Sequence, residues 1–125
     1  MATVLVIDDD EMHLMLMGNI LENAGYSVSS TADGPQGIMM FKEHSADLVL
    51  LDLGLPSMNG IEVLREIRTA DPKSKIIVVT GYGSIESAEV ALRYGAWDYV
   101  EKPIEVENFL EKIRTAIGVA GDEEE

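Results

Sequence analysis

A chain of 125 residues, 46% of them hydrophobic and 26% charged, fits one compact globular domain and leaves no room for a second. It contains no cysteine, which excludes disulfide bonds and thiolate metal sites, and its N-terminus resembles neither a signal peptide nor a membrane span. The net charge of -14 repels nucleic-acid phosphates and anionic lipids, so we expect neither as a direct partner. Because the sequence shows neither a signal peptide nor a membrane span, we expect a soluble, cytoplasmic protein.

Strand and helix patterns alternate along the first half of the chain. The predicted elements are a strand over residues 4–7, a helix over 11–24, a strand over 26–30, a helix over 34–44 and a strand over 48–51. Gly25 is placed to end the first helix, and Asp33 is a candidate N-cap of the second. The first and third strands are apolar throughout, which is typical of strands buried on both faces.

The second half continues this alternation after a loop over 52–59. The predicted elements are a helix over 60–69, a strand over 76–79, a helix over 84–94, a weaker strand over 97–100 and a helix over 105–117. Ser84 is a candidate N-cap, and Gly95 is placed to end the helix that follows it. We expect the folded domain to span residues 1–119 and residues 120–125 to form a flexible acidic tail.

Five strands alternating with five helices predict a doubly wound α/β fold around a parallel sheet. The three strands that are apolar throughout should be central, and the mixed strands over 26–30 and 97–100 should be edges. In a sheet of flavodoxin-like order 2-1-3-4-5, strands 2 and 5 are the edges, so the polarity of the strands agrees with this topology.

Polar residues follow the strands at the points where each strand ends. Asp8 and Asp9 follow the first strand and Asp52 the third, while Thr80 and Lys102 follow the fourth and fifth. Because strands 1 and 3 are neighbours in the predicted order, these carboxylates should meet at the point where strand order reverses. Each residue alone could be an ordinary turn, capping or surface residue, but their convergence at one edge indicates a site.

Carboxylates held close together repel one another unless a cation lies between them. Oxygen ligands around a small pocket suit Mg²⁺, which leaves coordination positions free for phosphoryl oxygens. Phosphoryl transfer needs mainly positioning and charge neutralisation from a protein. We therefore predict that Asp52 is a nucleophile that forms an acyl phosphate, with Lys102 and Thr80 contacting phosphoryl oxygens.

Four segments carry a family resemblance, namely residues 4–11 (VLVIDDDE), 50–56 (LLDLGLP), 79–81 (VTG) and 95–103 (GAWDYVEKP). They resemble the signature segments of response-regulator receiver domains of two-component, or phosphorelay, signalling, and the resemblance extends from Thr3 to Ile117. It implies a phosphoprotein switch that catalyses only its own phosphorylation and dephosphorylation, rather than an enzyme acting on other substrates.

The resemblance also implies the roles of individual residues. Asp52 is the phospho-acceptor and, together with Asp9, binds Mg²⁺ directly. Asp8 assists the metal largely through water, and the backbone carbonyl of Gly54 is the third protein ligand.

Further implied roles concern the switch and the partners. Thr80 and Lys102 contact the phosphoryl group, Tyr99 is the aromatic switch residue, and the bond between Lys102 and Pro103 is cis. The phosphodonor is a sensor histidine kinase or a histidine phosphotransfer protein. The output passes through the face of the fourth helix and fifth strand to an effector domain or protein, and a phosphorylation-dependent homodimer is a further expected assembly.

Three other classes share part of this pattern. A Mg²⁺-dependent phosphatase with an aspartyl nucleophile has a second Asp two residues after the first, where this chain has Gly54. A receiver-like interaction module that is not phosphorylated is the second class, and the argument against it is the presence of the full set Asp8, Asp9, Asp52, Thr80 and Lys102. A flavodoxin-like nucleotide binder needs a glycine-rich loop after the first strand, where this chain has three aspartates.

The first helix carries more apolar residues than one buried stripe requires. The stripe can be supplied by Met17, Ile20, Leu21 and Ala24, with His13 or Leu16. We expect Leu14 and Met15 to point away from it, beside the acidic pocket, and to form the docking face for the histidine phosphodonor with Pro103 and Ile104. A homodimer contact through this helix and a wider buried stripe are the alternatives.

Overall fold

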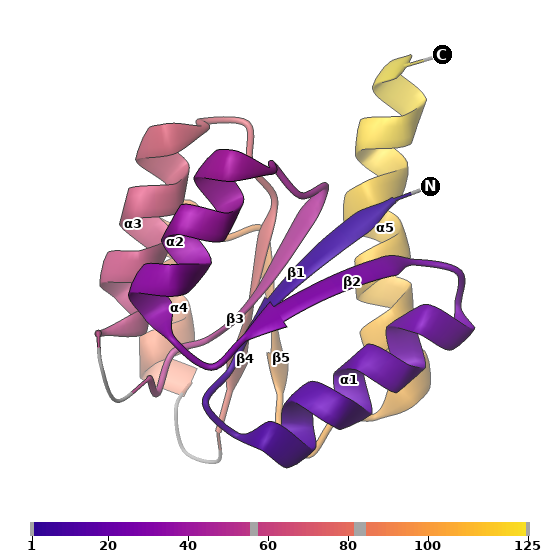
Figure 1. The fold of residues 1–125 in the computed structure, drawn as a ribbon, viewed down its shortest axis with the longest axis horizontal. Helices are drawn as coiled ribbons and strands as arrows, with labels where there is room; N and C mark the ends of the chain where they lie inside the picture. Colours follow the sequence, from indigo (N-terminus) through magenta and orange to yellow (C-terminus); the bar gives the residue numbers. More distant parts are fainter. Residues whose placement is uncertain (1, 56–57, 82–84, 125) are drawn as a thin grey trace.

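The computed structural model describes residues 2–55, 58–81 and 85–124, which form a five-stranded sheet with helices on both faces (Figure 1). The strands are β1 (Thr3–Ile7), β2 (Ser27–Thr31), β3 (Leu48–Asp52), β4 (Ile76–Thr80) and β5 (Asp98–Glu101). The helices are α1 (Glu11–Asn23), α2 (Gly34–Glu43), α3 (Gly60–Ala70), α4 (Ile85–Arg93) and α5 (Val106–Glu124). The ends of all these elements differ from the predicted ends by one residue at most, apart from the end of α5.

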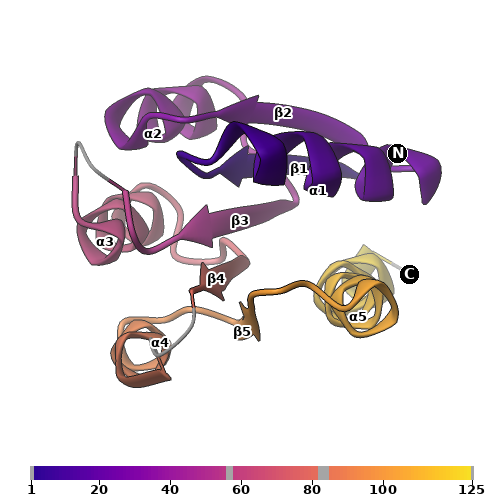
Figure 2. The same ribbon diagram turned by 90° about the horizontal axis from the view of Figure 1, so that it is seen from below.

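The strand order β2-β1-β3-β4-β5, with every pair parallel, confirms the topology that the strand polarity predicted. Strand order reverses beside β1, which pairs with β2 on one side and with β3 on the other. The helices α2, α3 and α4 cover one face of the sheet, and α1 and α5 cover the other (Figure 2). The chain is therefore doubly wound around the sheet, as expected.

Two apolar clusters, one on each face, hold the layers together. One cluster joins the central strands to α2, α3 and α4, with members that include Phe41, Ile67 and Ala91. The other joins the same strands to α1 and α5, with members that include Met17, Leu21 and Phe109. Successive strand residues point to opposite faces, so the continuous apolar sequences of β1, β3 and β4 supply both clusters at once.

The helix ends follow the capping residues in the sequence. The side chains of Asp10 and Asp33 accept hydrogen bonds from backbone N–H groups in the first turns of α1 and α2. Gly25 and Gly95, just beyond α1 and α4, have positive φ angles of 97° and 106°, which side chains rarely tolerate. The predicted cap Ser84 lies outside the described residues.

The helix α5 continues to Glu124, beyond the end predicted at Ile117. That prediction was wrong because it took the last apolar position as the end of the helix, whereas a helix without proline can continue past its buried turns at a cost of about 1 kcal/mol per glycine. Up to Glu124 the predicted acidic tail is therefore helical, and its flexibility stays a prediction. Even at this length α5, like every other described helix, lacks the apolar run needed to cross a bilayer.

The start of α3 lies against the segment after β3 because Gly60 has no side chain. A Cβ atom at Gly60 would lie 2.4 Å from the Cα atom and 2.9 Å from the carbonyl oxygen of Leu53. The Gly60 N–H group donates a hydrogen bond to that same oxygen at 3.3 Å. Backbone atoms cannot move aside as a flexible side chain can, so this contact closes the loop next to Asp52.

We expect Gly60→Ala to lower the free energy of unfolding by about 1–3 kcal/mol, because the added methyl group forces two backbone segments apart. The matched control is Gly18→Ala in α1, where an added Cβ meets nothing within 4 Å. That variant should be up to about 1 kcal/mol more stable, because alanine favours the helix. Urea denaturation measures both values, and equal effects would contradict the close approach at Gly60.

Candidate functional site

The strands β1, β3 and β4 end side by side at one edge of the sheet, and each end carries a polar side chain. Asp8 directly follows β1, while Asp52 and Thr80 are the last residues of β3 and β4. One carboxylate oxygen from each of Asp8, Asp9 and Asp52 lies within 4.8 Å of the other two. The structure thus brings the three carboxylates together, as the strand order predicted.

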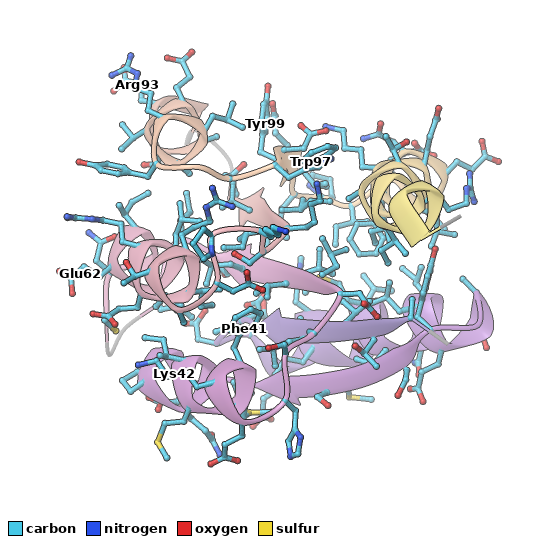
Figure 3. The ribbon with its side chains drawn as sticks, turned by 90° about the horizontal axis from the view of Figure 1, so that it is seen from above. Phe41, Lys42, Glu62, Arg93, Trp97 and Tyr99 are labelled. Atoms are coloured by element: carbon cyan, nitrogen blue, oxygen red, sulfur yellow. The ribbon has the colours of Figure 1, made fainter. Side chains whose placement is uncertain are left out.

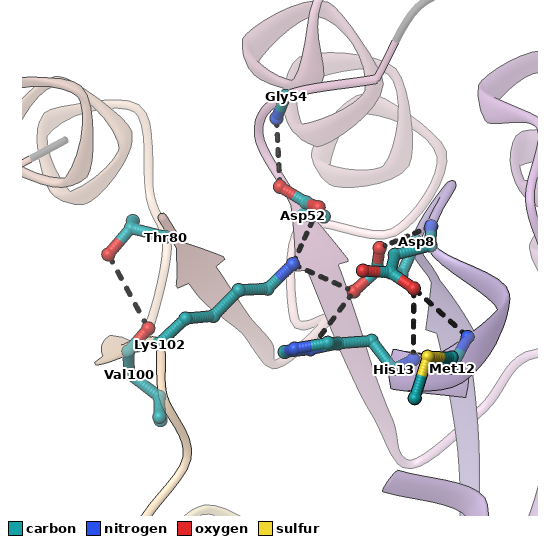
Figure 4. Close-up of polar contacts among 9 residues, drawn as sticks. Asp8, Met12, His13, Asp52, Gly54, Thr80, Val100 and Lys102 are labelled. Carbon is teal, nitrogen blue, oxygen red and sulfur yellow. Dashed lines mark hydrogen bonds and ion pairs between the residues drawn. The ribbon is translucent and has the colours of Figure 1, made fainter. Parts of the chain in front are cut away.

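Lys102 reaches across this edge from the segment after β5. Its Nζ atom lies 3.0 Å from Asp52 Oδ2 and 3.3 Å from Asp8 Oδ2 (Figure 4). Its backbone N–H group donates to the Thr80 carbonyl oxygen at 2.8 Å, and its bond to Pro103 is cis, as the resemblance implied. One half-buried ammonium group therefore compensates two carboxylates in part.

Asp8 is fully buried at the centre of these charges. Its Oδ1 atom accepts a hydrogen bond from the Asp10 N–H group at 2.9 Å. Its Oδ2 atom has no hydrogen-bond partner among the described residues, although Lys102 Nζ and His13 Nδ1 lie 3.3 Å and 3.8 Å away. Burial, reinforced by the negative charge of Asp52, raises the pKa of the Asp8 carboxyl group.

The pKa of the Lys102 ammonium group is also raised. Burial alone lowers it, but the hydrogen bond and charge of Asp52, together with the charge of Asp8, outweigh that effect. Lys102 therefore stays charged in the pocket, where its charge is needed.

A buried carboxylate oxygen without a hydrogen-bond partner, inside a cluster of three carboxylates, fits a cation. The side-chain donors are all oxygens, which is the set that Mg²⁺ prefers. Gly54 lies two residues after Asp52, and its N–H group donates a hydrogen bond to Asp52 Oδ1 at 2.9 Å. The residues present are therefore compatible with Mg²⁺.

A cavity of about 240 Å³ lies beside the acidic cluster and is lined by Asp52, Gly54, Thr80, Ser87 and Lys102, among others. Ser87 was not predicted from the sequence, because nothing in the sequence shows that α4 approaches this end of the sheet. His13 was predicted only as a candidate for the buried stripe of the first helix. A signal for His13 existed, since it lies in the first turn of a helix that begins at the site.

The two residues predicted to form the switch lie on neighbouring strands. The buried Thr80 hydroxyl group donates to the Val100 carbonyl oxygen at 3.5 Å, the outer limit of a hydrogen bond (Figure 4). Tyr99, labelled in Figure 3, is half-buried against the cluster on the α4 face. Lys112 Nζ lies 5.0 Å from its ring centroid. The Thr80 hydroxyl group thus faces β5 through a weak bond.

The prediction for the docking face is wrong in one respect. Leu14 is half-buried against the cluster on the α1 and α5 face, so it belongs to the buried stripe. The stripe includes Leu14 because Leu14, Met17 and Leu21 lie three and four residues apart, on one face of the helix. The exposed apolar side chains of α1 are Met12, Met15 and Leu16.

The loop after β5 likewise contains one exposed and one partly buried residue of the predicted docking face. Pro103 is exposed, whereas Ile104 packs partly against the cluster on the α1 and α5 face. Met15, which is 69% exposed, and Pro103 therefore remain available to a partner.

The family model of the response regulator receiver domain matches residues 4–114, which is most of the chain. The chain belongs to the response regulator receiver domain family. Chemotaxis protein CheY of Bacillus subtilis is 34% identical to this receiver domain over 115 residues, covering 91% of the chain and 96% of CheY. Transcriptional regulatory protein ZraR of Escherichia coli (strain K12) is 35% identical over 114 residues, but the chain spans only 26% of the length of ZraR.

Solved structures agree with this assignment. The response regulator receiver domain protein from Clostridium thermocellum has a TM-score of 0.92 and 32% identity, covering 97% of this chain and 98% of that one. The CheY-like receiver domain protein from Methanospirillum hungatei JF-1 has a TM-score of 0.93 and 34% identity, covering 98% of both chains. This chain therefore resembles receiver domains of two-component signalling in both sequence and fold.

We expect Asp8→Asn to raise the free energy of unfolding at neutral pH in the absence of Mg²⁺, because it removes a buried charge next to Asp52. The native pKa of Asp8 lies above the unfolded value of 3.8, so ionised Asp8 destabilises the native state above its native pKa. This destabilisation is relieved as the pH falls through the native pKa, and the advantage of the variant should shrink with it.

Urea denaturation between neutral pH and the unfolded pKa of 3.8 measures the difference in the free energy of unfolding between Asp8→Asn and the unmodified chain. Glu43→Gln makes the same change in net charge at an exposed position and should leave stability nearly unchanged. An advantage of Asp8→Asn that is independent of pH would contradict the assignment to Asp8.

Proposed function

We propose that the Asp52 carboxylate of this receiver domain accepts a phosphoryl group from a phosphohistidine of a donor protein. The resulting conformational change would be transmitted to an output partner. The observation that supports this proposal is the pairing of Lys102 with Asp52 and Asp8 beside a cavity of about 240 Å³. The Asp52 carboxylate is the nucleophile, and the Lys102 ammonium group 3.0 Å away is placed to pair with a negatively charged phosphoryl oxygen.

In the transfer, an Asp52 carboxylate oxygen forms a bond to phosphorus while the phosphorus–nitrogen bond of the donor breaks. The electron pair of the broken bond stays on the imidazole nitrogen, which takes up a proton from solvent and leaves as neutral imidazole. Water later forms a bond to phosphorus while the bond from phosphorus to the Asp52 oxygen breaks. The electron pair of that bond stays on the Asp52 oxygen and restores the carboxylate, and the water gives up a proton to solvent as inorganic phosphate leaves. No other group of the chain is consumed, so the domain returns to its starting state.

Mg²⁺, when bound, would neutralise charge on the carboxylates and on the phosphoryl oxygens. Asp9 and Asp52 would hold it through carboxylate oxygens, and Asp8 would assist. The Gly54 carbonyl group would be the remaining protein ligand. Asp8 Oδ2 supports this set, because it has no hydrogen-bond partner among the described residues and shares its cationic neighbour, Lys102 Nζ, with Asp52.

The switch follows from competition for the Thr80 hydroxyl group. Its bond to the Val100 carbonyl oxygen is long at 3.5 Å, so a charged phosphoryl oxygen would be the better acceptor. Movement of Thr80 toward the phosphoryl group would leave room for the Tyr99 ring to turn inward. The face of α4 and β5 would then carry the signal to an output partner.

The partners follow from the same scheme. A sensor histidine kinase or a histidine phosphotransfer protein would supply the phosphoryl group, and an effector domain or protein would read the α4 and β5 face, with or without formation of a homodimer. The net charge of -14 argues against nucleic acid as the direct partner of this chain. The domain would act in the cytoplasm.

Incubation with acetyl phosphate and Mg²⁺ should add one phosphoryl group, detected by intact mass as a single adduct on Asp52. Asp52→Asn should show no adduct there, and Asp9→Ala should show none because the metal is lost. Lys102→Ala should still be labelled but should lose the conformational response. An adduct of equal yield on Asp52→Asn would refute the proposed acceptor.

The corrected docking face centres on Met15. We expect Met15→Glu to slow phosphotransfer from a histidine kinase about tenfold or more, while labelling by acetyl phosphate and the melting temperature stay unchanged. Leu14→Glu should instead lower the melting temperature, because that side chain is half-buried.

The matched control for docking is Met39→Glu, which changes a 60% exposed methionine on α2, on the opposite face of the sheet. It should leave phosphotransfer unaffected. Equal slowing by Met15→Glu and Met39→Glu would show a general effect of charge and would end the docking assignment.

A further inference from the structure

Cationic side chains gather at the end of the sheet opposite Asp52. Five of the nine Lys and Arg residues lie between positions 65 and 93. Three of them, Arg68, Lys73 and Lys75, line a cavity of about 1050 Å³ beside the starts of β3, β4 and β5. In a chain with a net charge of -14, a cavity lined by three cations needs an explanation.

Among the described residues, none of these three cations forms an ion pair with a carboxylate. Two carboxylates also line the cavity, but both accept hydrogen bonds from backbone N–H groups. Asp47 accepts from Thr3 at 2.7 Å and Asp71 accepts from Lys73 at 2.9 Å. The positive charge of the cavity is therefore not cancelled by close pairing.

The Arg68 guanidinium group is held in position by backbone. Its Nη1 atom donates to the Ser74 carbonyl oxygen at 3.0 Å. Its Nε atom packs against Gly95, where an added Cβ would lie only 2.8 Å away. Only part of the guanidinium donor set is used by these contacts, so the group is oriented yet still has donors for a ligand.

The cavity also holds an unsatisfied hydroxyl group. Ser74 is 6% exposed, and its Oγ atom has no hydrogen-bond partner among the described residues. A buried hydroxyl group without a partner is costly, and an oxyanion entering the cavity would offer it an acceptor.

Trp97 supplies a flat apolar wall beside the cations. It lines the same cavity and is 40% exposed, and Lys75 Nζ lies 3.9 Å from its ring centroid. Figure 3 labels Trp97, which lies one residue before β5. An indole next to cations can contact a planar ring while the cations hold an attached anionic group.

We propose that this cavity, which we call the basic pocket (Arg68, Lys73, Ser74, Lys75 and Trp97), binds the phosphate group of a small phosphorylated molecule. Guanidinium and ammonium groups are the usual phosphate ligands in proteins. The ligand is small because the total charge of the chain repels polyanions, whereas one phosphate group close to three cations responds mainly to the local field. The pocket is remote from Asp52, so the proposal does not depend on phosphorylation.

Trp97 makes the proposal directly testable, because it is the only tryptophan of the chain and its indole N–H gives a single signal in a ¹⁵N–¹H spectrum. The full chain is titrated in Mg²⁺-free buffer with AMP, ribose 5-phosphate, inorganic phosphate and adenosine. We expect AMP to shift the indole signal with saturation at millimolar concentration. Tighter binding of AMP than of ribose 5-phosphate would identify a nucleotide as the preferred ligand. Equal binding of the two would show that the pocket recognises the phosphate group alone.

The deciding comparison is between two charge-neutralising variants. Lys73→Gln should weaken AMP binding about tenfold, because it removes a charged donor at an exposed position of the pocket. Lys42→Gln, an exposed lysine on α2, makes the same charge change and should not weaken it. Arg68→Gln should weaken AMP binding at least as much as Lys73→Gln does, and the melting temperature checks that this variant still folds.

Three results would overturn the proposal. These are the absence of a saturable shift with any of the three phosphates, adenosine binding as tightly as AMP, and equal loss in Lys73→Gln and Lys42→Gln. Labelling of Asp52 by acetyl phosphate should be the same in Lys73→Gln as in the unmodified chain, so a failure of this proposal is distinguishable from a failure at Asp52.

Discussion

Two carboxylates, those of Asp8 and Asp52, are buried close together because β1 and β3 pair in parallel with Ile7 opposite Leu51. Like charges at this distance in a partly dry environment are unfavourable unless a cation joins them. Lys102 supplies that cation from the segment after β5 and contacts both carboxylates. The charge balance at this edge thus ties together strands that are far apart in the chain.

This charge balance is incomplete. Among the described residues, one ammonium group lies beside the three carboxylates, and an oxygen of Asp8 has no hydrogen-bond partner. The proposed Mg²⁺ ion and phosphoryl group would complete the set of charges, so their arrival would redistribute contacts that Lys102 and Thr80 already make. A weak bond such as that from Thr80 to Val100 is suited to this exchange, because little stability is lost when it breaks.

The two ends of the sheet carry opposite local charge for a structural reason. Carboxylates lie at or just after the ends of β1 and β3, whereas Lys73 and Lys75 precede β4 and Arg68 packs against Gly95, before β5. Because all strands are parallel, every strand end lies at one edge and every start at the other. The acidic site and the basic pocket are therefore separated by the length of the sheet, and each can be altered without direct contact with the other.

The sequence alone determined the fold class, the strand order and the identity of the acidic site. Apolar strands distinguish central from edge positions, and residues at strand ends must share an edge of a parallel sheet. It did not determine how each helix rotates over the sheet. Leu14 was misassigned for that reason, and the approach of Ser87 and His13 to the site was missed. The basic pocket also required the structure, because Arg68, Ser74 and Trp97 come from three separate segments. Periodicity describes one segment at a time, whereas rotation and side-chain convergence depend on packing between segments, which only the tertiary structure decided.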